Sequence, residues 1–409
     1  MLNFYIFTGK IKCSAEGVYG MSILGIVAEY DPFHNGHLHH LQSSVAAVSP
    51  SAVLAVISGP FRQRGIPALL SPFSRAECAL AAGADAVFSL PVIWTLRDAE
   101  HYALGAVSLL SSLGATHIAF GAETADTALL RKTAELLEDP PAEVKDALHS
   151  ALSDGTGYPA ALSEAAGAYA PECGELLRHP NNILAVCYLR AIRRLSLSVF
   201  PVVIPRSGDY FSDRIVPDAP SASAITESLR RGAWPQAFDA LPSFSRRVIR
   251  REYLSGTIPD SARLDALLLD KLRSLRKEDA ACLPDCAEGL DCALIKAAAE
   301  ANSRDDLIRR LTTRRYSSAR ISRLCTSALL GITKNDAEET PLPKTALLLA
   351  IKKDPSVTGP WKNGSVQVMT AAKWLNSADP ADAAAWRIWS LLCGKPSAWP
   401  FEKKLITKC

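Results

Sequence analysis

Four apolar runs of strand length, each followed by a helical pattern, constrain the fold of this chain more than any other feature. The runs are "ILGIVAEY" at 23–30, "AVLAVISG" at 52–59, "ADAVFSLP" at 84–91 and "THIAFG" at 116–121. The helical patterns that follow them lie at 36–47, 71–82, 98–112 and 124–137. Continuous apolar strands that alternate with such helices predict a parallel sheet covered on both faces. The fold class is therefore α/β, with a Rossmann-like parallel-sheet domain in the first half of the chain.

The pattern changes near residue 218. "SVFPVVIPR" at 198–206 predicts one more strand, and from "SASAITESLRRG" onward the periodicity is mostly helical, with one late strand signal in "SVQVMT". We therefore predict a sheet domain at 21–218 and a mostly helical domain at 219–409. Residues 1–20 have neither a long apolar core nor a small-residue cleavage site, so they do not resemble a signal peptide. Because Met21 directly precedes the first strand, we expect it to be the true start and the leader to be disordered.

Composition limits the classes of protein that this chain can belong to. Its 409 residues are 48% hydrophobic, which is enough for a large core and for two or three domains. A net charge of +3 does not by itself indicate a nucleic-acid-binding protein, so any basic surface must be local. The ten cysteines form no CxxC pair, which favours reduced thiols in a cytoplasmic protein. No apolar run reaches about 18 residues, so no membrane-spanning helix is expected.

The first apolar run ends in "EYDPFHNGH", which places two histidines where a strand becomes a helix. His34 and His37 share one face of the first helical turn, and Gly36 between them lets the backbone approach a ligand. A helix N-terminus offers unpaired N–H groups and a partial positive charge, so it binds phosphate. Imidazole donors there suit the charge that develops when pyrophosphate leaves an attacked α-phosphate. We predict that both histidines are catalytic without a protein-bound metal; the alternative is a pair of surface histidines.

A longer set of motifs narrows the function. In order along the chain they are "GIVAEYDPFHNGH", "SGPFRQRGIPA", "AEHYALGAVSLL", "FGAE", "HPNNILAVCYLRAI" and "TTRRYSSARISRL". Together they resemble the tRNA(Met) cytidine acetate ligase family of the HxGH nucleotidyltransferase superfamily, from about Ser22 to beyond residue 330. The resemblance implies a nucleotidyltransferase-like first domain and an enzyme that activates acetate with ATP, with Mg²⁺ as a further expectation. The enzyme would release pyrophosphate and then AMP as it acetylates N4 of the wobble cytidine of elongator tRNA(Met).

The resemblance also implies an ATP site, residue by residue. Its opening stretch corresponds to Val27, Ala28, Glu29, Tyr30, Asp31, Pro32, Phe33, His34, Asn35, Gly36, His37, Leu38, His39 and His40. Gly121 corresponds to the glycine of "FGAE", Asn181 to the asparagine of "HPNN", and Arg206 to the arginine of "VIPRSGDY". Gly121 ends a strand where backbone must approach the nucleotide, Asn181 could read a base edge, and Arg206 could clamp a phosphate or stack on adenine.

Four positions depart from the family's usual residues. They are Asp31 and Pro60, where asparagine is usual, Ser71 or its neighbour Pro72 in "LLSPFSRAE", where a lysine is common, and Leu162 in "GYPAALSEA", where an arginine is common. Loss of two basic groups beside a polyphosphate site leaves a weakened enzyme as an open alternative. Our hypothesis is that Arg62, Arg64 and Arg75 compensate for them.

An arginine-rich stretch at 304–324, "RDDLIRRLTTRRYSSARISRL", contains only Asp305 and Asp306 as acids. Arginine binds phosphate bidentately and stacks on bases. We predict a helical tRNA-binding segment in which Tyr316 and Arg320 share a face one turn apart. Its contact residues are Arg309, Arg310, Arg314, Arg315, Tyr316, Arg320 and Arg323. The alternative is a solvated helix face, and "SFSRRVIRREYL" at 243–254 is a second candidate strip.

Two other functions stay open from the sequence. An adenylyltransferase that acts on a small phosphorylated acceptor would use the same HxGH chemistry, but it would need little beyond the sheet domain. A catalytically weakened RNA-binding relative would keep the arginines and lose turnover. The sequence indicates no oligomeric state.

Overall fold

A computed structural model of the chain describes residues 21–206, 221–287, 289–352, 365–402 and 406–408. The predicted leader, 1–20, lies outside the described residues. At the centre is one eight-stranded sheet in the order β5-β4-β1-β2-β3-β6-β7, with β8 paired to β6. The strands are β1 Ile23–Ala28, β2 Ala52–Ser58, β3 Ala86–Leu90, β4 His117–Ala122, β5 Phe200–Pro205, β6 Thr345–Lys352, β7 Gln367–Met369 and β8 Ile406–Lys408.

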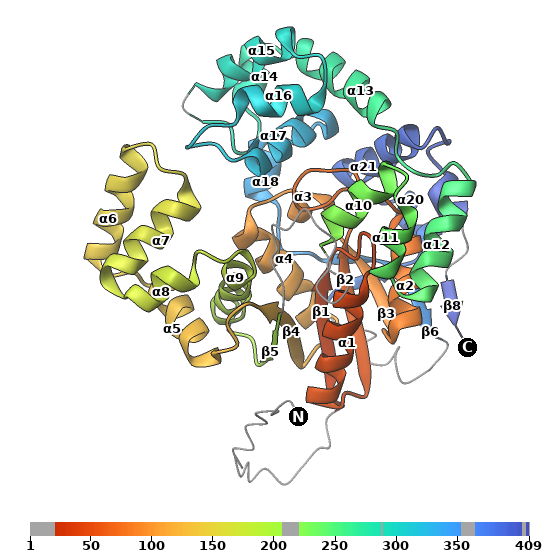
Figure 1. Ribbon diagram of the computed structural model, residues 1–409, viewed down its shortest axis with the longest axis horizontal. Helices are drawn as coiled ribbons and strands as arrows, with labels where there is room; N and C mark the ends of the chain where they lie inside the picture. Colours follow the sequence, from red (N-terminus) through yellow and green to blue (C-terminus); the bar gives the residue numbers. More distant parts are fainter. Residues whose placement is uncertain (1–20, 207–220, 288, 353–364, 403–405, 409) are drawn as a thin grey trace.

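Helices cover both faces of this sheet and extend beyond it (Figure 1). Those of the first half are α1 Asn35–Val48, α2 Pro72–Ala82, α3 Val92–Thr95, α4 Ala99–Ser112, α5 Thr127–Glu138, α6 Ala142–Ser153, α7 Tyr158–Tyr169, α8 Pro171–Leu176 and α9 Pro180–Arg194. The later helices are α10 Ala222–Arg230, α11 Trp234–Asp239, α12 Ser243–Leu254, α13 Ser261–Arg273, α14 Lys277–Ala281, α15 Leu290–Glu300, α16 Arg304–Leu311, α17 Ser318–Leu330, α18 Lys334–Glu339, α20 Ala371–Leu375, α21 Pro380–Leu392 and α22 Trp399–Glu402.

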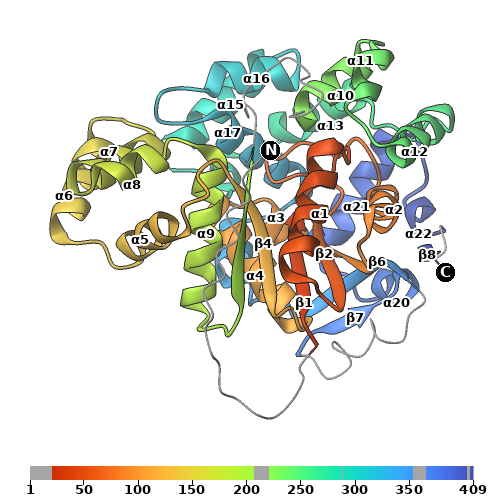
Figure 2. The same cartoon turned by 60° about the horizontal axis from the view of Figure 1, so that its bottom comes forward.

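The predicted α/β fold is confirmed, and strands β1 to β5 pair in parallel. Every residue of β2 and β3 is buried, as expected for strands that are covered on both faces. Helices α1 and α2 contact one face of the sheet, and α4 and α9 contact the other. Figure 2 shows α1 in front of β1 and β2, with α9 beside β4.

The strand order reverses beside β1. From β1 the chain adds β2 and then β3 on one side, and β4 and β5 follow on the other side. A parallel sheet opens a crevice at the carboxyl ends of its strands where the order reverses, and ligands bind there. The histidine motif follows β1, and Gly121 lies near the end of the adjacent strand β4. The fold therefore brings these two sequence motifs to one place.

Strand β6 was not predicted, and it shows that the sheet does not end at residue 218. Its sequence "TALLLAIK" pairs antiparallel to β3, with Val87 opposite Ala350 and Ser89 opposite Leu347. Alanine and leucine favour helices over strands, so the local preference of this run argues against a strand. Pairing with a distant strand and burial between two helical layers decide its structure. The mostly helical second half thus contributes three strands to the sheet begun by the first half.

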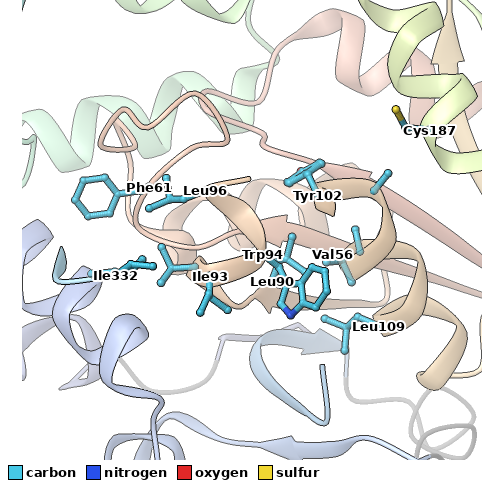
Figure 3. Packing of buried hydrophobic residues seen from close by; sticks show 14 of the residues in the cluster. Val56, Phe61, Leu90, Ile93, Trp94, Leu96, Tyr102, Leu109, Cys187 and Ile332 are labelled. Carbon is cyan, nitrogen blue, oxygen red and sulfur yellow. The ribbon is translucent and has the colours of Figure 1, made fainter. Parts of the chain in front are cut away.

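A tightly packed layer under α4 supports the carboxyl ends of the first strands. Figure 3 shows the indole of Trp94 beside Leu90 and Leu109. Gly105 of α4 faces this indole, and a Cβ there would lie 2.7 Å from its ring carbons. Only glycine allows this approach of helix to tryptophan, so the position of α4 against α3 depends on it.

Candidate functional site

The start of α1 holds its two histidines in one fixed arrangement. His34 is the N-cap residue, and its Nδ1 accepts a hydrogen bond of 3.3 Å from the backbone N–H of His37. Reciprocally, Nδ1 of His37 accepts from the backbone N–H of His34, also at 3.3 Å. The two rings stack with centroids 3.7 Å apart. Because each Nδ1 is an acceptor, each ring carries its proton on Nε2 and can donate it to a ligand.

The imidazoles at this site are neutral near neutral pH. Burial, reinforced by the charge of Arg206, lowers the pKa of His34 to about 3. Burial likewise lowers the pKa of His37 well below its usual value, with further contributions from His34 and Arg206. Burial also lowers the pKa of His40, to about 4. The site therefore offers neutral hydrogen-bond donors to an anion, and Arg206 supplies positive charge beside them.

Arg206 is held over β4 by Gly121 and Asn181. Its Nη1 donates to Oδ1 of Asn181 at 2.9 Å. A Cβ at Gly121 would lie 2.7 Å from Cγ and Cδ of Arg206. Gly121 thus makes room for the arginine side chain. The structure brings Gly121, Asn181 and Arg206 together, as predicted. The group that approaches Gly121 closely is the side chain of Arg206, whereas the sequence predicted the nucleotide there.

Glu123 is a site residue that the sequence prediction missed. One of its carboxylate oxygens accepts from Nδ2 of Asn181 at 2.6 Å, and the other accepts from the backbone N–H of Asn182 at 2.8 Å. It therefore occupies the N-terminus of α9 and orients the asparagine that holds Arg206. The available signal was the acid of "FGAE", which directly follows a strand end.

The predicted ATP-binding opening divides into two sets. The residues that line the cleft described below are Val27, Ala28, Glu29, Tyr30, Asp31, His34, Gly36, His37, His39 and His40. Pro32, Phe33, Asn35 and Leu38 are not among the lining residues. Phe33 is buried against Tyr30, with ring centroids 4.6 Å apart. Asn35 donates through its backbone N–H to the carbonyl of Ala240 at 2.9 Å, so Phe33 and Asn35 help to fix the shape of the turn.

Asp31 and Arg75 are structural. Asp31 is buried and accepts from the backbone N–H groups of Leu69 and Leu70, at 2.8 and 3.0 Å. Arg75 is also buried and donates to the carbonyls of Glu29, Ser58 and Gly59, which tie together the ends of β1 and β2. The hypothesis that Arg75 replaces a missing surface cation is therefore wrong, because its guanidinium is used inside the fold.

The remaining positions that differ from the family's usual residues, and the arginines proposed to compensate for them, lie in different surroundings. Arg64 lines the cleft, as the compensation hypothesis requires. Arg62 lines it too, but its side chain is largely buried and pairs with Asp31 at 3.5 Å. Ser71 is the N-cap of α2 and accepts from the backbone N–H of Ser74 at 3.0 Å. Leu162 lies on α7 and also lines the cleft, where it adds apolar surface.

One cleft of 2130 Å³ joins the histidines to the arginine-rich stretch. It runs from the start of α1 past Gly121, Asn181 and Arg206 and reaches five arginines, which are Arg304, Arg314, Arg315, Arg320 and Arg323. Arg309 and Arg310 lie away from it on α16 and form ion pairs with Asp306. Tyr316 is not a lining residue, but its ring lies 4.9 Å beneath the guanidinium of Arg320. The structure thus brings the predicted nucleotide site and most of the predicted tRNA-binding residues together.

The arginine-rich stretch is not one helix. Helix α16 ends at Leu311 and α17 begins at Ser318, because Thr313 and Ser317 accept hydrogen bonds from following backbone N–H groups and interrupt the helix. The loop between them packs on the turn before α7. Arg314 donates to Oγ1 of Thr156 at 3.0 Å, and Arg315 donates to the carbonyl of Leu152 at 3.1 Å. These two arginines therefore join two helical regions as well as lining the cleft.

The fold, the HxGH turn and the cleft at the strand-order reversal define a nucleotidyltransferase of the HxGH class. A family model described as "HIGH Nucleotidyl Transferase" matches residues 21–369. Two relatives named tRNA(Met) cytidine acetate ligase, from Fervidobacterium nodosum and Kosmotoga olearia, are each 35% identical over 78% of this chain and over 75% and 77% of their own lengths. The chain belongs to the tRNA(Met) cytidine acetate ligase family.

Solved structures agree with this assignment. The crystal structure of Thermotoga maritima TmcAL bound with alpha-thio ATP is 28% identical, with a TM-score of 0.86 over 95% of this chain and 100% of that chain. The apo form of the same protein gives a TM-score of 0.88.

Two kinds of feature are absent from the described ranges. Within these ranges, no helix combines the length and the apolar character needed to cross a membrane. Nor do the described residues contain a group of three or more His, Cys, Asp or Glu placed to hold a metal ion.

Proposed function

We propose that this protein is an ATP-dependent ligase that forms acetyl-adenylate and transfers the acetyl group to N4 of the wobble cytidine of elongator tRNA(Met). The observation that carries the proposal is the single cleft that joins a phosphate-binding helix start to five arginines. The names of its relatives and the ATP analogue bound by the Thermotoga maritima protein support it. A small-acceptor adenylyltransferase would leave the arginine-lined half of this cleft without a role.

In the first step, a carboxylate oxygen of acetate attacks the α-phosphorus of ATP. The bond from that phosphorus to the bridging oxygen breaks, and pyrophosphate leaves. The Nε2–H groups of His34 and His37, together with the start of α1, would donate to the phosphate oxygens that gain charge. Arg206, fixed by Asn181, would add a cation on the same side.

In the second step, N4 of cytidine attacks the carbonyl carbon of acetyl-adenylate. The bond between that carbon and the phosphate oxygen breaks, AMP leaves, and the nitrogen loses a proton to solvent. The arginines of the cleft would hold the RNA backbone during this step. Base and adenylate can meet because both parts of the site share one cavity.

Mg²⁺ is proposed to enter with ATP. The two nearby carboxylates are already engaged: Glu29 accepts from the backbone N–H of Gln63 at 2.7 Å, and Asp98 caps α4 and pairs with His101. Magnesium keeps most of its waters and can be bound mainly through substrate phosphates. The ion would neutralise the leaving pyrophosphate without a dedicated protein cage. We also propose a cytoplasmic location, which the free thiols of the eight described cysteines support.

The test is incubation of the protein with ATP, labelled acetate and tRNA(Met), followed by mass spectrometry of the nucleosides. We expect N4-acetylcytidine, with AMP and pyrophosphate released in step, and no product from acetyl-coenzyme A without ATP. Exchange of labelled pyrophosphate into ATP should require acetate and should not require tRNA. Exchange that depends instead on a small phosphorylated acceptor would establish the alternative adenylyltransferase.

A further inference from the structure

The wall of the cleft that α7 contributes is aromatic and apolar. Tyr158 and Leu162 lie one helical turn apart on this wall, and both line the cleft. Tyr158 is 52% exposed, whereas Tyr102 and Tyr188, which also line the cleft, are 4% and 3% exposed. Among the tyrosines and phenylalanines of the described ranges that line the cleft, Tyr158 is thus the one that offers an open ring.

The charged groups near Tyr158 already have partners. Arg190 forms ion pairs with Glu100 at 2.8 Å and with Glu138 at 3.0 Å. Glu100 and Asp98 line the same cleft as Tyr158. Partial burial and then the charge of Glu100 raise the pKa of the Tyr158 hydroxyl, and the charge of Arg190 opposes this rise. This part of the cleft disfavours a phosphate, because Glu100 and Asp98 line it and Arg190 is already paired with Glu100 and Glu138. An uncharged, flat group fits the position better.

The place of Tyr158 in the cleft links it to the arginine-rich stretch. Thr156, two residues before it, accepts from Arg314, and the carbonyl oxygen of Arg314 lies 2.8 Å from the position of a Cβ at Gly157. Arg320 and Arg323 line the same cleft, and the positive charge of Arg323 helps to lower the pKa of Asp98. An RNA strand whose phosphates met these arginines would pass close to the ring of Tyr158.

We propose that Tyr158 is a stacking platform for a nucleobase turned out of the RNA loop, and that this base is the target cytidine. The inference rests on the proposed function. Proteins that recognise single-stranded loops stack splayed bases on aromatic rings. Glu100 and Asp98 line the same cleft and carry acceptor oxygens, and cytosine presents an amine donor at N4. The HxGH turn would hold the adenylate, and α7 would hold the base that attacks it.

The test compares Tyr158→Ala and Tyr158→Phe with the matched control Tyr169→Ala. Tyr169 ends the same helix, is 54% exposed, and is not among the residues that line the cleft. We expect Tyr158→Ala to lower kcat/KM for tRNA acetylation by roughly 5- to 150-fold, as loss of one base–aromatic stack does. Tyr158→Phe should keep most of the activity, and Tyr169→Ala should keep all of it. Acetate-dependent pyrophosphate exchange and the melting temperature should be unchanged in all three variants.

Unchanged tRNA acetylation in Tyr158→Ala would overturn the proposal. A raised KM for ATP in pyrophosphate exchange would overturn it too, because the ring would then contact adenine. Binding of an anticodon stem-loop RNA, with and without the base at the target position, tests stacking independently of catalysis. Removal of the base should weaken binding to the wild type and have no further effect on Tyr158→Ala. If the wild type shows no acetate-dependent exchange but passes this binding test, the proposed function fails and the stacking site stands.

Discussion

The two ends of the cleft are built from similar polar side chains that are held in different ways. At the nucleotide end, His34 and His37 cap the backbone of α1, and Arg206 is fixed by Asn181. At the other end, Arg314 and Arg315 sit on a loop and reach across to the turn before α7, where they donate to Thr156 and to the carbonyl of Leu152. The first arrangement is anchored on two buried groups, His34 and Asn181, at the carboxyl edge of the sheet. The second depends on contacts between separate helical regions.

This difference follows from what each end must do. A transition state needs donors that are already in place, because reorganisation during the reaction costs catalytic power. A long RNA needs charge spread over a large surface, and each phosphate contact adds only a small amount of binding free energy. The comparison predicts large, specific effects at the nucleotide end and small, graded effects at the arginine end.

The largest effect is expected at the histidines. His34→Ala and His37→Ala should each lower the rate of acetate-dependent pyrophosphate exchange by about 10²–10³-fold, as loss of one oxyanion donor does. His34→Ala should also lower Tm, because it removes the buried N-cap of α1, so exchange by both variants is measured well below their melting temperatures. The matched control is His149→Ala, an exposed histidine on α6. Exchange near the wild-type rate in both variants, with ATP and acetate saturating, would remove the histidines from the mechanism.

The next effect concerns how Arg206 is held. Gly121→Ala places a methyl group where the arginine side chain lies, so it should displace the guanidinium. We expect a loss in kcat/KM for ATP of about 1.5–3 kcal/mol, the range for a hydrogen bond to a charged group. Arg206→Ala should cause a similar loss, and the double variant should be little worse than either single variant. Additive losses would show that Gly121 acts on the nucleotide independently of Arg206.

Stability should depend on pH through the nucleotide end. The pKa of His34 is about 3 in the folded protein and 6.5 in the unfolded chain, so the unfolded chain binds the extra proton as pH falls below 6.5. Between pH 7.5 and 5.5 this histidine should cost about 1.4 kcal/mol of unfolding free energy. Arginines stay charged throughout and contribute no such slope.

The matched comparison for this prediction is His34→Gln, whose stability should fall less between the two pH values when both are measured by urea unfolding. The change in unfolding free energy with pH must be compared between variant and wild type, because Asp382 changes the stability of both in the opposite direction. Burial raises its pKa to about 7, so its folded form gains stability as pH falls. An identical pH slope in wild type and variant would contradict a neutral, buried His34.

The sequence predicted the nucleotide end well because local and global signals agree there. Each apolar strand runs into a motif at its carboxyl end, and the reversal of strand order brings those ends together. The arginine end was predicted less well because its geometry depends on distant contacts. The break at 312–317 is decided by hydroxyl groups of Thr313 and Ser317 and by packing on the turn before α7. Strand β6 was missed for the same reason, since its partner β3 lies far away in sequence.

The smallest effects are expected from the arginines of the cleft. Arg320 lines the cleft. One edge of its guanidinium is fixed, because it donates to the carbonyl of Asp285 at 2.7 Å. Arg320→Gln should weaken tRNA binding modestly and reduce the slope of log affinity against log salt by about one. The control is Arg276→Gln, an exposed arginine paired with Asp279 on α14. Pyrophosphate exchange should be unchanged in both, because that chemistry belongs to the other end. If Arg320→Gln kept the full salt slope but lost acetate activation, the arginine end would serve the nucleotide, and the contrast between the two ends would be wrong.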